Sequence, residues 1–295
     1  MTAAAAPPAP AGAPIVAASG LRRVYHVRGG SELVAVGDVS FTIAPGSSLA
    51  IVGESGSGKT TVAKLLVGLE APDAGSITIN GLDRSRPDRG SRARRERGRD
   101  IQIVFQDPYT SLDRRQSVGD ALAEVVALHL RQRTEGAART RNTDRVRARV
   151  LELAEMVGLD ARQVRSRPQG LSGGQRQRVA IARALAAEPK ILILDESVAA
   201  LDVSIQAQIL NLLADIRDAT GITYVLISHD LAVVRQITDE CIVMRRGAVV
   251  ERATTAAVLD HPQDAYTRLL RDSVPRPGWK PVSRRAVTAA EAPPG

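Results

Sequence analysis

The chain has 295 residues, of which 44% are hydrophobic and only 2% aromatic, and its formal net charge at pH 7 is +8. That length fits one large domain, or one domain with an inserted subdomain, built around a mainly aliphatic core. The single cysteine, Cys241, excludes an internal disulfide and a cluster of thiolate metal ligands. The positive charge is compatible with nucleic acid, anionic lipid or an acidic partner, and a solvated surface is its simplest interpretation.

Both ends of the chain differ in composition from the rest. Residues 1–14 are rich in alanine and proline, with no basic start and no apolar run, which predicts a disordered tail rather than a signal peptide. Residues 276–295 are proline-rich and predict an irregular tail. No stretch approaches the roughly 18 apolar residues that a membrane-spanning helix needs. If the protein serves a membrane, we expect the spanning part to belong to another chain.

The N-terminal part of the chain has mostly strand patterns. Residues 59–69 follow a glycine-rich loop and have the apolar spacing of a helix. Residues 84–99 are dense in arginine and interrupted by Pro87, Gly90 and Gly98, which predicts an exposed, irregular segment. Apolar patterns predict strands at residues 15–27, 32–43, 48–52, 75–80 and 101–105.

Between about residues 110 and 187 the pattern becomes helical. Helices are predicted at 118–130, at 146–157 and from near Gly174, with a polar loop at 136–142. Strands are then predicted at residues 191–194, 222–227, 241–245 and 248–251, and helices at 203–219 and 231–237. Strand–helix alternation interrupted by a run of helices predicts an α/β fold with an inserted helical subdomain.

A phosphate-binding motif follows the strand at residues 48–52. The stretch Gly53–Thr60 fits the P-loop pattern G-x-x-x-x-G-K-[ST], with an apolar strand before it and a helix after it. Lys59 can reach the β- and γ-phosphates, and the Thr60 hydroxyl can ligate Mg²⁺. Alone, the motif does not separate a kinase, a GTPase and an ATPase. The candidate nucleotide-binding residues here are Gly53, Glu54, Ser55, Gly56, Ser57, Gly58, Lys59, Thr60 and Thr61.

Two adjacent carboxylates end the apolar strand that begins at Ile191. In an open α/β sheet, ligands bind at this end of the strands. Asp195 suits the coordination shell of Mg²⁺, and Glu196 suits a general base that activates water. Without the P-loop, a solvated pair of carboxylates would be the simpler interpretation.

The stretch Leu171–Gln175 reads LSGGQ, in which a serine and two glycines open a helix and so offer a second anion-binding helix start. Here the sequence resembles the ABC ATPase family, whose signature is LSGGQ. The resemblance implies a P-loop NTPase fold with a mixed-sheet core, an antiparallel β subdomain and a helical subdomain. It also implies a head-to-tail dimer, in which each ATP lies between the P-loop of one subunit and the signature of the other.

Further landmarks of that family occur in order, and the resemblance covers residues 15–275 with the helical insert at about 110–187. It implies that Tyr25 stacks on adenine, that Gln106 contacts Mg²⁺ and the attacking water, and that His229 contacts the γ-phosphate. It implies catalytic roles for Glu196, His229, Lys59 and Gln106, metal ligation by Thr60, Gln106 and Asp195, and nucleotide contacts from Ser172, Gly173, Gly174, Gln175 and Asp202.

Four phrases are similar to the ATPases of dipeptide and oligopeptide importers: residues 104–113, 200–208, 227–235 and 261–270. Relatives of that branch also move nickel and some oligosaccharides. Three positions depart from the family pattern: Ser197 replaces a usual proline, Ala199 a usual serine, and Asp264–Ala265 a usual His-Pro. The C-terminal cysteines that hold an iron–sulfur cluster in some relatives are missing, so no cluster is expected.

The resemblance implies ATP and Mg²⁺ as cofactors, and as partners a second ATPase subunit, identical or related, two membrane permeases and indirectly a substrate-binding protein. It implies a peripheral location at the cytoplasmic face of the membrane. A soluble ABC protein acting on nucleic acid or ribosomes is the alternative, but the paired cassettes, coiled coils or zinc inserts of such proteins are missing, so no nucleic-acid partner is expected. A P-loop kinase or GTPase would lack LSGGQ and the histidine at position 229.

Overall fold

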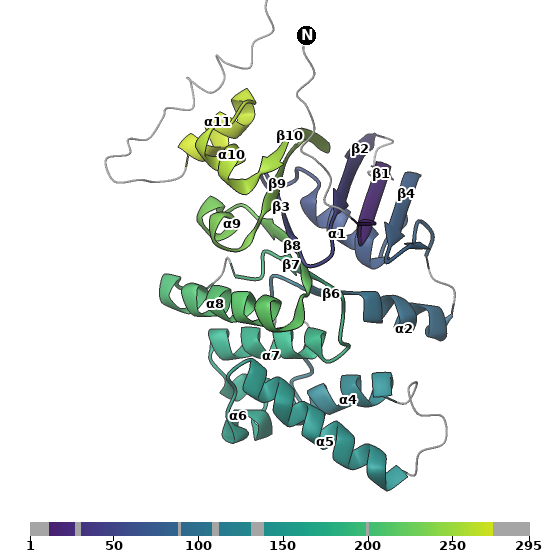
Figure 1. Cartoon of the computed structure of the whole chain (residues 1–295), viewed down its shortest axis with the longest axis vertical. Coiled ribbons are helices and arrows are strands. Elements are labelled where there is room, and N and C mark those ends of the chain that lie inside the picture. The colour runs from purple at the N-terminus through teal and green to yellow at the C-terminus, as the bar shows by residue number, and fades with distance from the viewer. Residues whose placement is uncertain are drawn as a thin grey trace, which may run out of the picture.

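The computed structural model describes residues 12–26, 31–87, 90–107, 112–130, 139–198 and 201–273, except for the side chains of residues 139–142. Two sheets organise this part of the chain (Figure 1). An antiparallel sheet has the order β2-β1-β4-β5, formed by β1 (Val16–His26), β2 (Glu32–Ile43), β4 (Ala74–Ile79) and β5 (Leu82–Asp83).

The larger sheet has the order β10-β9-β3-β8-β7-β6. Its inner strands pair in parallel, and β10 runs antiparallel to β9, so the sheet is mixed. This confirms the predicted fold class, a mixed α/β core beside an antiparallel subdomain. The strands are β3 (Ser48–Val52), β6 (Ile101–Val104), β7 (Ile191–Asp195), β8 (Thr223–Ser228), β9 (Glu240–Arg245) and β10 (Ala248–Thr254).

The two faces of the larger sheet belong to two different hydrophobic cores. Leu49 and Ile51 of β3 pack into the core shared with the antiparallel sheet and with α1 (Lys59–Val67). Ala50 and Val52 point to the other face, into the core that the remaining helices cover. This alternation is the period of two that a strand imposes on its side chains, and it fixes the register of β3 because both faces are buried.

Helices cover the second core in two groups. Figure 1 shows the helices of the insert gathered at one end of the molecule, away from α10 and α11. The insert contains α4 (Val118–Leu130), α5 (Arg139–Met156), α6 (Ala161–Arg165), the short 3-10 turn Pro168–Gly170 and α7 (Gly173–Leu185). The other group contains α8 (Val203–Thr220), α9 (Leu231–Ile237), α10 (Thr255–Asp260) and α11 (Ala265–Asp272). None of the described helices combines the length and the apolar character needed to cross a membrane.

The prediction for the arginine-rich segment was wrong in part. Helix α2 (Ser91–Asp100) occupies most of it, and Arg97 and Asp100 are buried. The Arg97 guanidinium donates a hydrogen bond to the carbonyl of Arg84, whose own guanidinium lies 2.9 Å from the Asp100 carboxylate. These contacts hold the helix against the core, although its sequence reads as a solvated surface.

Three other predictions need correction or fall outside the described residues. Helix α5 begins at Arg139, so the polar loop expected at 136–142 overlaps a helix. Helices α10 and α11 were not predicted. The tail residues 1–11 and 274–295, and Ala199, lie outside the described part of the chain.

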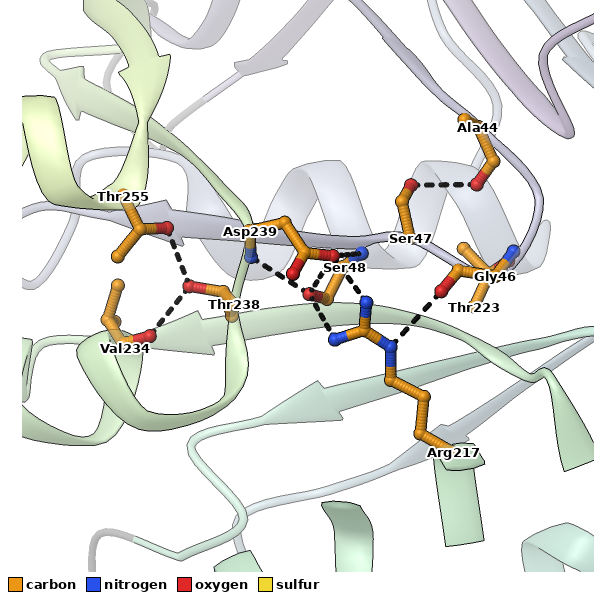
Figure 2. Close-up of polar contacts among 10 residues, drawn as sticks. All are labelled: Ala44, Gly46, Ser47, Ser48, Arg217, Thr223, Val234, Thr238, Asp239 and Thr255. Carbon is orange, nitrogen blue, oxygen red and sulfur yellow. Dashed lines mark hydrogen bonds and ion pairs between the residues drawn. The ribbon is translucent and has the colours of Figure 1, made fainter. Parts of the chain in front are cut away.

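A polar network joins the amino ends of three strands of the larger sheet (Figure 2). Arg217, in the last turn of α8, donates to the Gly46 carbonyl at 3.1 Å, to the Ser48 hydroxyl at 3.0 Å and to the Asp239 carboxylate. Asp239 also accepts from the Ser48 amide at 2.9 Å, and the Thr223 hydroxyl accepts from the Gly46 amide at 2.8 Å. We call Ser48, Arg217, Thr223 and Asp239 the amino-edge network. The loops that carry the predicted site residues lie at the opposite, carboxyl edge of the sheet.

Candidate functional site

Three loops leave the carboxyl edge of the larger sheet side by side. Val52 at the end of β3 pairs with Ser228 at the end of β8, and Asp195 at the end of β7 pairs with Ile227. The P-loop follows β3, His229 follows β8, and Glu196 follows β7. The parallel register thus brings together segments that lie far apart in the sequence, at the edge where ligands of such sheets bind.

The P-loop lies close to the backbones of two other strands, which explains why two of its positions are glycine. Gly53 has φ +149°, and a Cβ there would lie 2.1 Å from the carbonyl oxygen of Met244 in β9. Gly58 has φ +103°, and a Cβ there would lie 2.2 Å from the carbonyl oxygen of Ala35 in β2. Only glycine fits such close backbone approaches, so β2 and β9 hold the loop from both sides.

The side chain of Lys59 is buried and folds back onto the P-loop. Its ammonium donates hydrogen bonds to the carbonyl oxygens of Gly53 at 2.8 Å and Glu54 at 2.7 Å. Burial lowers the pKa of Lys59, although the carboxylates of Glu196 and Asp195 act in the opposite direction. The ammonium is therefore a partly dehydrated positive charge at the loop, which favours contact with a phosphate.

Asp195 and Thr60 place two oxygen atoms together beside the start of α1. The Thr60 hydroxyl donates to the Asp195 carboxylate at 3.3 Å. Asp195 is buried, and burial raises its pKa although the Thr60 hydrogen bond lowers it. A hydroxyl and a poorly solvated carboxylate are oxygen ligands of the kind that Mg²⁺ takes, so the residues present fit this ion.

Glu196 has a left-handed backbone conformation, with φ +47°. Its amide donates to the Ile227 carbonyl at 2.9 Å, which fixes the turn that follows β7. Its carboxylate lies 3.5 Å from Nδ1 of His229, whose side chain is 58% exposed. The imidazole therefore faces solvent, and the half-buried carboxylate, 21% exposed, lies beside it, where a water molecule and a phosphate can approach both.

The signature residues start helix α7 as the sequence predicts. Ser172 is the N-cap: its hydroxyl accepts from the Gln175 amide at 3.3 Å, and its own amide donates to the Gln175 side chain at 2.9 Å. A Cβ on Gly174 would lie 2.5 Å from the Ile205 side chain, so this glycine lets α7 pack against α8. Ser172 is exposed and Gly173 half-buried, and both are accessible to an anion from outside the chain.

Asp202 caps helix α8. Its carboxylate accepts from the Ile205 amide at 3.0 Å and from the Ser204 hydroxyl at 2.8 Å, and these hydrogen bonds lower its pKa. The structure therefore gives Asp202 a helix-capping role. Its nucleotide contact stays a prediction.

The remaining two candidate residues, Gln106 and Tyr25, lie at different places in the fold. Gln106 is exposed, two residues after Val104, which pairs with Leu194 of β7, so it leaves the same sheet edge. Tyr25 instead donates a hydrogen bond of 2.5 Å to Glu70, which follows the C-terminal end of α1, and the Arg23 guanidinium lies 5.0 Å from the centre of its ring. The structure thus places Tyr25 by the end of α1 that is remote from Lys59, and adenine stacking stays a prediction.

One residue that contacts the P-loop was not among the predicted site residues. The hydroxyl of Tyr266, on α11, accepts a hydrogen bond from the Glu54 amide at 3.0 Å. Tyr266 falls within the phrase 261–270, which indicated a subgroup but no function. No local pattern predicts a contact between residues 212 positions apart.

Comparisons with known proteins agree with this geometry. The family model described as ABC transporter matches residues 36–199. A dipeptide transport ATP-binding protein of Haemophilus influenzae is 41% identical over 268 residues, covering 89% of this chain and 79% of that protein. A glutathione import ATP-binding protein of Shigella flexneri is 46% identical over 246 residues, 83% of this chain, and the match spans only 37% of that longer protein. A dimeric ATP-binding cassette, MJ0796, solved in a post-hydrolysis state bound to ADP and Pi, is 31% identical with a TM-score of 0.70, over 81% of this chain and 98% of that chain.

Proposed function

This chain belongs to the ABC transporter family, and from that premise we propose that it is the ATP-hydrolysing subunit of an importer of dipeptides or oligopeptides. The observation that carries the proposal is the 41% identity to a dipeptide transport ATP-binding protein along 89% of this chain. The glutathione importer, whose substrate is itself a short peptide, supports the same substrate class.

The site supports hydrolysis of ATP by in-line attack of water on the γ-phosphate. We expect Glu196 to orient the water and accept its proton, because its half-buried carboxylate lies 3.5 Å from the imidazole of His229 at the sheet edge. Lys59 and His229 would stabilise the negative charge of the transferring group from two sides. Thr60 and Asp195 would hold Mg²⁺, which when bound neutralises charge on the phosphate oxygens.

We propose that the site is completed by a second ATPase subunit. Ser172 and Gly173 open an accessible helix start, but the Ser172 hydroxyl and amide are hydrogen-bonded to Gln175 in the same helix. A nucleotide on the P-loop of one subunit would meet this helix start from the other. The dimeric state of the related cassette supports this arrangement.

The further partners would be two membrane permeases and, indirectly, a substrate-binding protein, with this chain attached at the cytoplasmic face of the membrane. No nucleic-acid partner is proposed. Nickel and oligosaccharides are the alternative cargoes, and the names of the relatives favour peptides over both.

Co-purification from membranes tests the proposal, with the chain tagged and its ATPase activity measured after reconstitution. We expect permease subunits to co-purify, and a peptide-loaded binding protein to stimulate ATP hydrolysis. If ATP hydrolysis is stimulated instead by a binding protein loaded with nickel or an oligosaccharide, that ligand is the cargo and the peptide assignment is wrong. Co-purification with ribosomes and without permeases would overturn the transport function.

A further inference from the structure

Helix α11 contacts the P-loop through the side chain of Tyr266. Tyr266 is 4% exposed, and its hydroxyl accepts the hydrogen bond from the Glu54 amide. The Arg245 guanidinium lies 4.8 Å from the centre of its ring. Since Arg245 follows Met244, whose carbonyl lies against Gly53, one end of β9 supports both the P-loop and the tyrosine.

The partner of the tyrosine is one of the two peptide groups whose carbonyl oxygens accept from the P-loop lysine. The Gly53–Glu54 peptide is one planar unit. Its carbonyl accepts from the Lys59 ammonium at 2.8 Å, and its amide donates to Tyr266 at 3.0 Å. Rotation of this unit would break both hydrogen bonds together, so Tyr266 fixes the direction in which the carbonyl faces Lys59.

The orientation of Tyr266 is itself fixed by the start of its helix. The Asp264 carboxylate caps α11 by accepting from the Tyr266 amide at 2.8 Å. The Glu251 carboxylate of β10 accepts from the amides of Gln263 at 2.9 Å and Asp264 at 3.1 Å. Burial raises the pKa of Tyr266, so its hydroxyl is a neutral phenol at physiological pH, and the phenol oxygen can accept the Glu54 hydrogen bond.

We propose that Tyr266 is a positioning residue for ATP binding, holding the Gly53–Glu54 peptide so that Lys59 stays at the phosphate-binding loop. Helix α11 thereby becomes part of the nucleotide site, although none of its residues is expected to touch the nucleotide. The inference rests on the proposed binding of ATP at residues 53–60. A change in the docking of α11 would alter the affinity for ATP through this single hydrogen bond.

The test compares two tyrosines in the full chain. Tyr266→Phe removes the hydroxyl at the P-loop. Tyr224→Phe is the control. Tyr224 lies in the amino half of β8, and its hydroxyl, which is also buried, donates to the Leu213 carbonyl at 2.8 Å instead of contacting the P-loop. We expect both to lower the unfolding temperature, but only Tyr266→Phe to weaken ATP binding, by about five-fold, the equivalent of about 1 kcal/mol. The rate at saturating ATP should change much less than the apparent affinity.

Two further measurements keep the inference falsifiable if stability complicates the comparison. Hydrogen exchange of the Glu54 amide should be faster in Tyr266→Phe than in the wild type, and unchanged in Tyr224→Phe. Glu251→Ala, which releases the start of α11 without touching the P-loop, should weaken ATP binding in the same direction.

The outcomes separate this inference from the proposed function. If the wild-type chain binds no ATP, the proposed function fails. If the wild type binds ATP while Tyr266→Phe has unchanged ATP affinity and unchanged exchange at Glu54, Tyr266 only packs in the core, and the positioning role is overturned.

Discussion

The Thr60 hydroxyl and the Asp195 carboxylate lie 3.3 Å apart although 135 residues separate them in the chain. Their contact joins the start of α1 to the end of β7. The Thr60 hydroxyl, at this distance, is a weak hydrogen-bond donor for a buried carboxylate. Burial raises the pKa of Asp195 even though Lys59 lies nearby, so ionisation of this group costs free energy in the unliganded fold.

Asp195→Asn should therefore stabilise the unliganded protein at pH 7 by roughly 1 kcal/mol, the usual effect of one buried polar group. Because folding raises this pKa above its ordinary value of 3.8, the cost is fully present above the folded-state pKa, decreases as the pH falls through that pKa, and is gone below 3.8. The same variant should lose the added stability that Mg²⁺ with ATP confers. Urea unfolding with and without both ligands measures the two effects. A less stable unliganded variant would contradict the electrostatic argument.

Glu196→Gln should lower turnover by about 10²–10⁴, the usual contribution of a positioned base, while ATP still binds. The amide keeps the shape of the side chain but cannot accept the proton from water. Steady-state hydrolysis and equilibrium ATP binding check the two parts. Glu240→Gln, at the start of β9, removes a carboxylate that pairs with Arg252 at 3.0 Å, and it serves as the control with near-normal turnover. A near-normal rate in Glu196→Gln would remove this residue from the role of base.

Two inactive variants of this chain should complement each other if a site is shared between copies. Lys59→Ala disables the P-loop and Ser172→Arg blocks the signature helix, so each homodimer has no intact site. A mixed dimer has one site with both parts intact, and random pairing restores about a quarter of all sites. Hydrolysis by the mixture measures this. Lys59→Ala mixed with Thr60→Ala is the control, because no pairing restores a P-loop. No recovery in the first mixture would contradict a site shared between two copies of this chain.

Arg217→Ala should destabilise the fold by about 1–2 kcal/mol, because it removes hydrogen bonds to the buried Ser48 hydroxyl and to the Gly46 carbonyl, while Asp239 is 49% exposed and adds less. Arg235→Ala is the matched control. Arg235 also pairs with an aspartate, Asp260, but both side chains are about half exposed, so its loss should cost less than about 1 kcal/mol. Urea unfolding of the two variants compares them. Equal losses of unfolding free energy in the two variants would show that the amino-edge network stabilises the fold no more than an exposed ion pair does.

Local patterns predicted the parts of the fold and site that depend on short stretches of chain. The P-loop between β3 and α1, the carboxylates ending β7 and the capped start of α7 each follow from neighbouring residues. Helix α2 was missed because half of its residues are arginine, and the burial of one of them, Arg97, depends on a contact with Arg84 that the sequence does not predict. Such contacts are set by tertiary packing, which overrides local propensity.

The positions of two tyrosines show the same limit at the site. The Tyr25 hydroxyl donates a hydrogen bond to Glu70, near the far end of α1, a contact that the sequence does not predict. Tyr266 carried no predicted role, yet it contacts the P-loop across 212 residues. Pairing of side chains over such separations depends on how α1 and α11 dock, and no periodicity or motif encodes that.

The amino-edge network gives the larger sheet one pinned end. Arg217 clamps β3, through Ser48, to the start of β9 at Asp239, and Thr223 ties β8 to the same corner (Figure 2). Because these contacts cross-link three strands, we expect the amino edge of the sheet to stay closed when the loops at the opposite edge rearrange.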